Sequence, residues 1–448
     1  MKHFTLEEIA VACGGKYVGS EQQKQLAITS VERDSRQIKD GSLFLAIKGE
    51  RVDGHDYINK CYESGAVCTI CEKAPDTDKP YILVDSTLEA VKKIAKAYRK
   101  KFDIPIVGVS GSVGKTSTKE MLYAVLSQKY KTHKTQGNLN NELGVPLTLL
   151  AMPEDTEAAV IEMGISDFGE MTRLSEMVCP TICVLTIIGC CHLENLGDRD
   201  GVLKAKTEMF SFADDNAEFI LNGDDDKLAT VSNVKGKKTI FFGLSDKNNY
   251  FAENIKNNGE GGVTASLCFE DKKLDVTIPA IGSYMVSNAL GAIAVGRLLG
   301  LSDEQLINGV QAYKTVGSRA NVINTGKIRI IDDCYNANPT SVMASLDTLA
   351  NFEGRKVAIL GDMKELGTDE LKLHFDTGVY AKSKADRVFA VGPLAKELAK
   401  GADCEWFENI EQLISAIPAL INEGDTVLVK ASHSMQFENI VSFLSQEI

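Results

Sequence analysis

The chain has 448 residues, more than one hydrophobic core usually supports, so about three domains are expected. Hydrophobic residues make up 44% and charged residues 25% of the sequence, which is typical of a folded globular protein and excludes a disordered one. The formal net charge of −13 argues against non-specific binding to nucleic acid or to anionic membranes. An anionic substrate would therefore need a local basic pocket.

The first ten residues carry Glu7 and Glu8 where a signal peptide has an apolar core, and no later apolar run is long enough to cross a bilayer. We therefore expect a cytoplasmic protein. Eleven cysteines, scattered mostly through apolar runs, indicate reduced buried thiols rather than disulfides. Cys68 and Cys71 form a lone CxxC inside a predicted strand, and without a second pair at zinc spacing we favour buried thiols over a metal or redox site.

Residues 1–101 mix short helices and strands. Thr5 is predicted to cap a helix over 6–13. A polar loop over 51–56 precedes a helix over 57–64, and His55 on this loop is more typical of a capping or surface histidine than of a catalytic one. The basic segment 88–102 predicts a solvated helix, and we place the first domain boundary at its end.

The next segment predicts a strand, a phosphate-binding loop and a helix. An apolar run over 104–109 leads into Gly-Lys-Thr at 114–116, and a helical pattern follows to 129. Val109 stands where the usual motif has glycine, so a shorter, tighter loop is expected; the alternative is an ordinary glycine turn. Alone, the loop predicts only a bound nucleoside triphosphate. The candidate nucleotide-binding residues are Ser110, Gly111, Ser112, Val113, Gly114, Lys115, Thr116 and Ser117.

Strands and helices alternate from 102 to 313, which predicts a mostly parallel sheet covered on both faces. Ligands of such sheets collect at the carboxyl ends of the strands. The predicted strands are 104–109, 158–163, 182–188 and 218–221.

Three polar clusters follow strand ends in this region. Asparagines 138, 140 and 141 lie in an amide-rich loop that suits either a polar ligand or a simple turn. Glu162 ends an apolar strand, a standard position for a Mg²⁺ ligand. His192 follows the next strand and is either a ligand or a structural histidine. Lys204 and Lys206 are two residues apart on a predicted helix, so only one of them is expected to face the site.

The last segment, 314–448, again alternates strands with helices and predicts a second doubly wound, Rossmann-like sheet. The carboxylates in this segment also fit an ordinary role as helix caps. Its predicted strands are 327–331, 356–360, 387–391 and 426–429.

The three polar clusters, taken together with the phosphate loop and the N-terminal segments 34–36, 40–44 and 48–55, carry a family resemblance. Two further motifs match it: Asp-Asp-Cys-Tyr-Asn-Ala-Asn-Pro at 332–339 and Gly-Asp-Met-Lys-Glu-Leu-Gly at 361–367. With these motifs the chain resembles the Mur ligases of bacterial cell-wall synthesis over essentially its whole length. The resemblance implies an α/β protein of three domains: a UDP-sugar-binding domain (1–101), a central P-loop ATP-binding domain (102–313) and a C-terminal Rossmann-like domain (314–448).

The resemblance also implies residue roles. Lys115 and Thr116 would hold the phosphates of ATP and Mg²⁺, and Glu162 and His192 would ligate magnesium, two ions in all. Lys206 would be converted by CO₂ to a carbamate, because a free lysine, with a pKa of about 10.4, repels Mg²⁺ whereas a carbamate offers it oxygens. The implied nucleotide contacts are Asn288, Arg319, Asp333 and Asn336. The implied substrate contacts are Ser35, Arg36, Asp53, Gly54, His55, Asn138, Asn140 and Asn141.

The sequence departs from the family pattern at three positions. Tyr284 and Met285 stand where these enzymes often have His and Asn, and His433 stands where they usually have Arg.

The implied reaction joins D-Ala-D-Ala to UDP-MurNAc-tripeptide at the expense of ATP, through an acyl phosphate. We expect a monomer with small-molecule substrates and no nucleic-acid or membrane partner. Two other hypotheses remain open: a folylpolyglutamate-type ligase, for which residues 1–101 would be superfluous, and a binding subunit that holds ATP without ligating anything.

Overall fold

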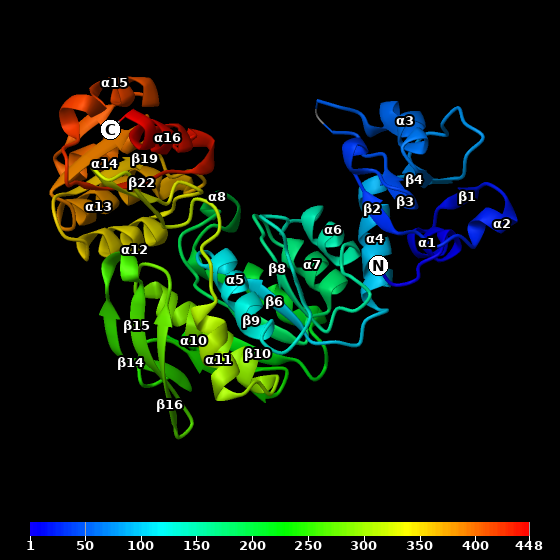
Figure 1. Ribbon diagram of the computed structural model, residues 1–448, viewed down its shortest axis with the longest axis horizontal. Coiled ribbons are helices and arrows are strands. Elements are labelled where there is room, and N and C mark those ends of the chain that lie inside the picture. The colour runs from blue at the N-terminus through cyan, green and yellow to red at the C-terminus, as the bar shows by residue number, and fades with distance from the viewer. Residues whose placement is uncertain (50, 448) are drawn as a thin grey trace.

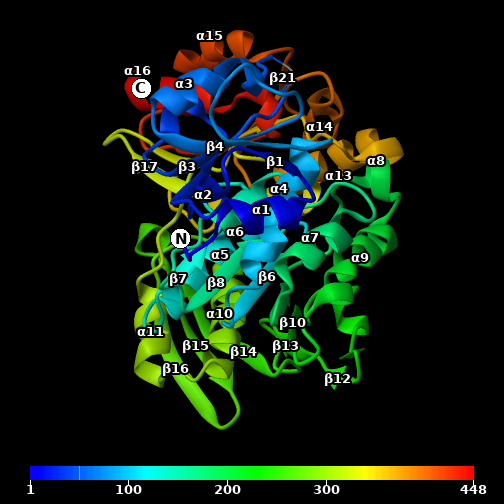
Figure 2. The same ribbon diagram turned by 90° about the vertical axis from the view of Figure 1, so that its right-hand side faces the viewer.

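The computed structural model describes residues 1–49 and 51–447. Its elements form three bodies in chain order, and the first and last both lie on one side of the central body (Figures 1 and 2). Within the described residues each body has one large sheet, of five, nine and six strands, and a two-stranded ribbon is added in the middle. None of the described helices is long and apolar enough to cross a membrane. The predicted α/β architecture is confirmed, whereas the exact domain boundaries stay a prediction.

The N-terminal sheet has the strand order β1-β5-β4-β3-β2. The predicted first helix is present: the Thr5 side chain accepts a hydrogen bond from the backbone of Glu8, and Gly14, with φ of 70°, ends the helix. Cys68 and Cys71 lie on β4 as buried free thiols. The elements are α1 Leu6–Cys13, β1 Lys16–Val18, α2 Glu21–Lys24, β2 Ser30–Glu32, β3 Ser42–Leu45, α3 Ile58–Glu63, β4 Ala66–Cys71, β5 Tyr81–Leu83 and α4 Thr87–Arg99.

Helix α4 corrects one expectation, because it is not a solvated helix. Val91, Ile94 and Tyr98 are fully buried on one face, at the spacing of an amphipathic helix. The helix packs against α1 and against α6 and α7 of the central body. Arg99 is also buried, and its Nε donates to the carbonyl of Val178 at 2.8 Å. The lysines of α4 stay at least partly exposed, but the helix joins two bodies, which composition alone does not reveal.

The central sheet has the order β16-β15-β14-β13-β10-β9-β6-β8-β7. Neighbouring strands from β14 to β7 pair in parallel, and β15 and β16 extend the sheet with antiparallel pairs that the sequence pattern did not predict. The four predicted strands are confirmed as β6, β8, β9 and β10. The strands are β6 Ile106–Ser110, β7 Thr132–Lys134, β8 Ala158–Glu162, β9 Ile182–Leu185, β10 Glu218–Asn222, β13 Ile240–Phe242, β14 Tyr250–Asn257, β15 Val263–Phe269 and β16 Lys272–Ile278, with β11 Asn233–Val234 and β12 Lys237–Lys238 forming the ribbon.

Each face of the central sheet has its own apolar cluster. Val107 and Val184 pack with residues of α5 and α10, whereas Ile161 and Leu185 pack with residues of α4, α6 and α7. The sheet is therefore covered on both faces, as predicted. The described helices do not cover the ends of the strands. The helices are α5 Lys115–Leu126, α6 Gly144–Leu150, α7 Glu170–Val178, α8 Leu193–Leu196, α9 Arg199–Thr207, α10 Tyr284–Leu298 and α11 Asp303–Gln311.

The C-terminal sheet has the order β17-β18-β22-β19-β20-β21, and only β17 is antiparallel to its neighbour. The four strands predicted there are confirmed as β18, β19, β20 and β22. The elements are β17 Asn321–Asn324, β18 Arg329–Asp332, α12 Pro339–Ala350, β19 Lys356–Gly361, α13 Glu370–Lys382, β20 Arg387–Val391, α14 Ala395–Ala402, β21 Glu405–Phe407, α15 Ile410–Leu420, β22 Thr426–Lys430 and α16 Glu438–Glu447.

Candidate active site

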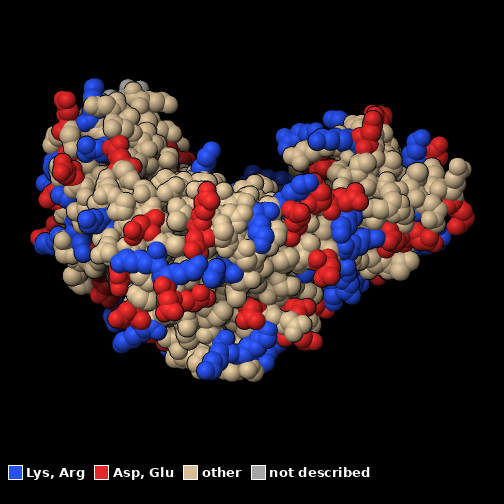
Figure 3. Space-filling model, turned by 60° about the horizontal axis from the view of Figure 1, so that its bottom comes forward, with Lys and Arg blue, Asp and Glu red and all other residues tan. Residues whose placement is uncertain are grey.

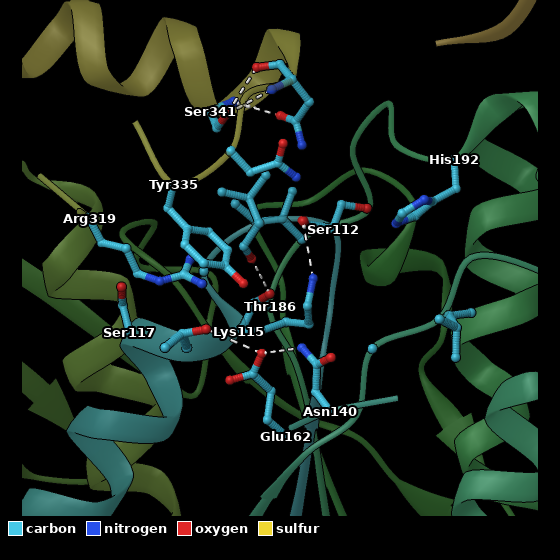
Figure 4. A pocket seen from close by; sticks show the side chains of 18 of the residues that line it. Ser112, Lys115, Ser117, Asn140, Glu162, Thr186, His192, Arg319, Tyr335 and Ser341 are labelled. Carbon is cyan, nitrogen blue, oxygen red and sulfur yellow. Dashed lines mark hydrogen bonds between the residues drawn. The ribbon is translucent and has the colours of Figure 1, made fainter. Parts of the chain in front are cut away.

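A pocket of about 750 Å³ lies at the carboxyl ends of the central strands. It is bordered by the loop before α5, by the amide-rich loop, by the start of α10 and by the loop after β18 of the C-terminal body (Figure 4). Leu88, Glu89 and Lys92 of α4 complete the border. The strand-end position predicted for ligand binding is therefore occupied by a single pocket to which all three bodies contribute.

The phosphate loop is as short as Val109 predicted, because β6 ends at Ser110 and α5 begins at Lys115. Gly111 has φ of 148°, and a Cβ there would lie 2.0 Å from the hydroxyl of Thr186, so no larger residue fits. The Ser112 amide donates to the carbonyl of Ile187 at 2.7 Å, which ties the loop to the end of β9. The backbone and the N-terminus of α5 thus form a rigid cradle of the kind that binds phosphate.

Lys115 folds back over this loop. Its Nζ donates to the carbonyl of Gly111 at 2.7 Å, and burial lowers the pKa of its ammonium. A lysine held this close to the cradle can exchange the loop carbonyl for a phosphate oxygen by a small side-chain rotation.

Glu162, at the end of β8, is brought together with two other predicted residues. Its Oε1 accepts from Thr116 Oγ1 at 3.2 Å and from Asn140 Nδ2 at 2.7 Å. Its Oε2 is buried and accepts no hydrogen bond from the described residues. A carboxylate oxygen left free beside a threonine hydroxyl fits a hard divalent cation such as Mg²⁺.

The three asparagines of the amide-rich loop have different surroundings. Asn140 binds Glu162, whereas Asn141 accepts from the amide of Gly144 at 2.8 Å and so caps the following helix while still bordering the pocket. Asn138 is exposed and lies outside the residues that line the pocket. Turn formation is therefore confirmed at Asn141, whereas ligand recognition by this loop stays a prediction.

His192 borders the pocket but faces the C-terminal body. Its Nδ1 lies 2.6 Å from Oε2 of Glu365, and this hydrogen bond lowers the pKa of the Glu365 carboxyl. Both residues have left-handed backbone conformations, with φ of 53° and 64°. Across residues 1–49 and 51–447, no three His, Cys, Asp or Glu side chains gather as they would around a metal ion. A ligand role for His192 therefore stays a prediction.

Lys206 is buried on α9, whereas Lys204 is exposed, so the two lysines lie on different faces of the helix, and whether Lys206 faces the site stays a prediction. Burial lowers the pKa of Lys206 to about 8. Lys206 is not among the residues that line the pocket.

Asp333 follows β18 and is held by residues that the sequence interpretation missed. Its Oδ2 accepts from Lys430 Nζ at 2.6 Å and from Ser345 Oγ at 2.5 Å. Lys430 ends β22, and its side chain is only 3% exposed. The signal was present, since a lysine directly after a predicted buried strand matches the strand-end rule that selected Glu162.

A stack of side chains forms another wall. The Arg319 guanidinium lies 3.9 Å from the centre of the Tyr335 ring, and the His433 ring centre lies 5.6 Å from that of Tyr335. Arg319 and Tyr335 border the pocket (Figure 4). Asn336 also borders it, although its side-chain oxygen accepts from the amide of Ala337. Tyr335 was not singled out in advance, and His433, which stands where the family usually has arginine, packs against its ring.

The other two departures, Tyr284 and Met285, lie at the start of α10. Asn288 accepts from Thr118 Oγ1 at 3.1 Å and donates to the sulfur of Met285 at 3.4 Å. Met285 is a core residue, 2% exposed, whereas Tyr284 borders the pocket, and burial raises the pKa of its phenol. Asn288 therefore keeps its expected place beside the phosphate loop.

The predicted substrate residues of the N-terminal body lie apart from this pocket. Arg36 pairs with Asp34 at 2.6 Å. Both ring nitrogens of His55 are engaged, Nδ1 with Asp53 at 2.6 Å and Nε2 with the amide of Glu72 at 2.9 Å, and the residue that caps the short helix Gly54–Tyr57 is Asp53 rather than His55. Ser35, Gly54 and these residues are absent from the pocket lining, and their role in binding stays a prediction.

The fold and the site define a class. The phosphate loop lies on a mostly parallel sheet, and a second sheet of a nucleotide-binding type borders the same pocket. This is the architecture of an ATP-dependent enzyme of several domains.

Three family models match successive parts of the chain: "Mur ligase family, catalytic domain" over 27–108, "Mur ligase middle domain" over 109–296 and "Mur ligase, glutamate ligase domain" over 318–433. The chain belongs to the Mur ligase family, and the resemblance stated from the motifs is confirmed.

Individual relatives match along nearly the whole chain. The chain is 37% identical to UDP-N-acetylmuramoyl-tripeptide–D-alanyl-D-alanine ligase of Bacillus subtilis, covering 98% of each. A crystal structure of MurF from Acinetobacter baumannii is similar with a TM-score of 0.91 and 29% identity, covering 100% of both chains. A MurF ligase from Thermotoga maritima in complex with ADP is similar with a TM-score of 0.84 and 31% identity, covering 93% of this chain and 97% of that one.

Proposed function

We propose that this protein is the ATP-dependent ligase that joins D-Ala-D-Ala to UDP-MurNAc-tripeptide in the synthesis of peptidoglycan precursors. The observation that carries the proposal is the full-length similarity to relatives of that name, together with a pocket in which the phosphate loop, Glu162 and Asp333 border one space. We also infer a monomer that works in the cytoplasm, where its small-molecule substrates are made.

The phosphate loop and its lysine would bind the triphosphate. Lys115 and the amides at the start of α5 offer positive charge to the γ-phosphate, and Arg319 faces the same space from the C-terminal body. Thr116 and Glu162 would hold Mg²⁺, with His192 contributing to a second ion after leaving Glu365. The bound metal would neutralise negative charge on the phosphates.

The chemistry consists of two displacements. The terminal carboxylate of the tripeptide attacks the γ-phosphorus of ATP, the bond to ADP breaks, and an acyl phosphate forms. The amine of D-Ala-D-Ala then attacks the acyl carbon, the bond to phosphate breaks, and the amide and inorganic phosphate are released. Lys115 stabilises the charge that develops on the transferred group in the first displacement.

The other predicted residues would hold the two ends of the substrates. Asn288, Asp333 and Asn336 border the same pocket as the phosphate loop and would contact the nucleoside. In the N-terminal body the UDP group would contact Ser35, Arg36, Asp53, Gly54 and His55, and Asn138, Asn140 and Asn141 would face the peptide end.

Lys206 would carry the carbamate. Its pKa of about 8 leaves a fraction of the amine neutral near neutral pH, and only the neutral amine reacts with CO₂. The product is an anion that could bind Mg²⁺. Mass spectrometry of native protein kept in bicarbonate, with Lys206→Ala as the matched control, tests this step by a gain of the mass of CO₂ in one protein only.

The function is tested by phosphate release with purified protein, ATP, Mg²⁺, UDP-MurNAc-tripeptide and D-Ala-D-Ala, omitting each component in turn. Release should require all of them, and mass spectrometry should find the pentapeptide product. Release without either carbon substrate, or acceptance of a folate and glutamate instead, would contradict the proposal. Loss of turnover in Lys206→Ala with nucleotide binding retained would separate a ligase from a mere ATP-holding subunit.

A further inference from the structure

Helix α5 carries a completely buried lysine, Lys119, that no part of the proposed mechanism uses. It lies three residues after Thr116, which places both side chains on the same face of the helix. Lysine is almost never fully buried unless its charge is paired, so this position calls for a specific partner.

The ammonium of Lys119 lies among three acceptors. Its Nζ donates to the carbonyl of Gly137 at 3.1 Å, lies 3.2 Å from Oε1 of Glu120 and lies 3.5 Å from Oε2 of Glu162. Glu120 is paired through its other oxygen with Lys134. Two lysines and two glutamates therefore alternate from Lys134 on β7, through α5, to Glu162 at the pocket.

Lys119 is the cation nearest to the one oxygen of Glu162 that accepts no hydrogen bond from the described residues. The opposite oxygen is already held by Thr116 and Asn140. An ionised carboxylate buried this deeply is costly without a nearby positive charge. Gly137 belongs to the loop that also carries Asn140, so the same ammonium contacts both the carboxylate and the loop that orients it.

We propose that Lys119 is a positioning residue for the metal-binding carboxylate. Before the metal binds, its ammonium lies against Oε2 of Glu162 and orients the carboxylate, and its bond to Gly137 holds the loop that places Asn140 on Glu162. Lys119 itself contacts neither metal nor substrate. The proposal rests on the metal site of the proposed function, and it adds a residue that prepares that site.

We predict that removing the charge of Lys119 destabilises the metal-free protein more than the metal-bound one, because a bound cation then stabilises the Glu162 carboxylate instead. Lys119→Gln removes the charge and keeps a donor for Gly137. Lys119→Met removes both. Lys131→Gln is the matched control, since Lys131 forms an exposed pair with Asp155.

The measurement is thermal unfolding without metal and with saturating Mg²⁺ and ADP. We expect Lys119→Gln to lower the metal-free melting temperature by about 3 °C or more, and Mg²⁺ with ADP to raise it by clearly more than in the wild type. Lys119→Met should lower the metal-free melting temperature more than Lys119→Gln does. Lys131→Gln should have the melting temperature of the wild type. An equal ligand-induced shift in wild type and Lys119→Gln would overturn the proposal.

A Glu162→Gln background tests the link between Lys119 and Glu162 separately from the placement of the metal at Glu162. With a neutral side chain at 162, adding Lys119→Gln should lower the metal-free melting temperature by much less than it does with Glu162 present. An equal loss in both backgrounds would mean that Lys119 serves only the fold and would refute its link to Glu162. If Glu162→Gln instead leaves the shift caused by Mg²⁺ intact, the placement of the metal fails, while the metal-free comparison still decides the role of Lys119.

Discussion

The nucleotide pocket and the predicted UDP-binding segment are built in opposite ways. In the pocket, side chains distant in sequence bind one another: Thr116 and Glu162 are 46 residues apart, and Asp333 and Lys430 are 97 apart. In the N-terminal segment the pairs are local, since Arg36 binds Asp34 and His55 binds Asp53, each two residues away. The pocket is therefore organised by the tertiary fold, whereas the segment is organised mainly by local pairs, with one longer contact from the amide of Glu72 to His55.

The two regions also lie on separate bodies. Figure 3 shows the molecule hollowed between its two outer lobes. Helix α4 connects the N-terminal body with the central one, because its apolar face packs on both. Its Lys92 also borders the pocket. A substrate bound at its UDP end would have to reach along this helix to bring its carboxylate to the phosphate loop.

The largest effect is expected from Lys430→Met, which removes a charge from the nucleotide pocket. This change leaves the Asp333 carboxylate largely buried without its cation, and we expect it to lower the free energy of unfolding by about 3–5 kcal/mol. Denaturant unfolding followed by the fluorescence of Trp406, the single tryptophan, reports directly on the C-terminal sheet. The double variant Lys430→Met/Asp333→Asn should recover part of the loss; no recovery would mean that the charge pair is not the cause.

Lys115→Ala should have the next largest effect, on activity. Removing the ammonium from the phosphate cradle should reduce kcat/KM for ATP by about 10²- to 10³-fold, because the developing charge loses a preorganised partner. The KM for the UDP substrate should stay unchanged, which would sharpen the division between the two regions. Lys131→Ala, an exposed lysine variant, should behave like the wild type in the same steady-state assay.

Lys206→Met tests the buried amine through pH. A base whose pKa is lowered by folding destabilises the protein while it is protonated, so the unfavourable contribution is full below pH 8 and fades as the pH rises to the ordinary lysine value of about 10.4. In CO₂-free buffer the Met variant should be more stable than the wild type by up to roughly 3 kcal/mol at pH 7 and by less than about 1 kcal/mol at pH 10. A difference that does not depend on pH in denaturant unfolding would contradict this expectation.

The smallest effect is expected from the exposed segment. Arg36→Ala should raise the KM for UDP-MurNAc-tripeptide by about tenfold, as expected for losing one charged contact to a phosphate, without changing the KM for ATP. Lys24→Ala, on the same body and also in a surface ion pair, is the matched control. Equal KM values in Arg36→Ala and the control would remove this residue from the binding site.

The fold was largely predictable because its signals are local. Apolar runs bounded by turn residues predicted eight strands of the two larger sheets, and Gly-Lys-Thr after such a run predicted the phosphate loop. The antiparallel strands β15 and β16 were missed, and the burial of α4 was misjudged. A basic composition cannot show that Val91, Ile94 and Tyr98 face two bodies at once.

The site was predictable to the same extent. Strand-end position selected Glu162, the family resemblance implied Asp333, and both border the pocket. Lys119 and Tyr335 gave no such signal. Lys119 lies inside a regular helix, and the role of Tyr335 depends on its contact with Arg319, which comes from another part of the chain. The contact between His192 and Glu365 joins two bodies and has no local pattern at all.

The sequence by itself determined the elements, the phosphate loop and the family, since each rests on residue types at short, fixed spacings. Only the tertiary structure decided which charges meet: Lys119 with Glu162, Lys430 with Asp333 and His192 with Glu365. The physical reason is that the energy of a buried charge depends on what lies within a few ångströms of it, and in a chain of three bodies those neighbours come from distant parts of the sequence.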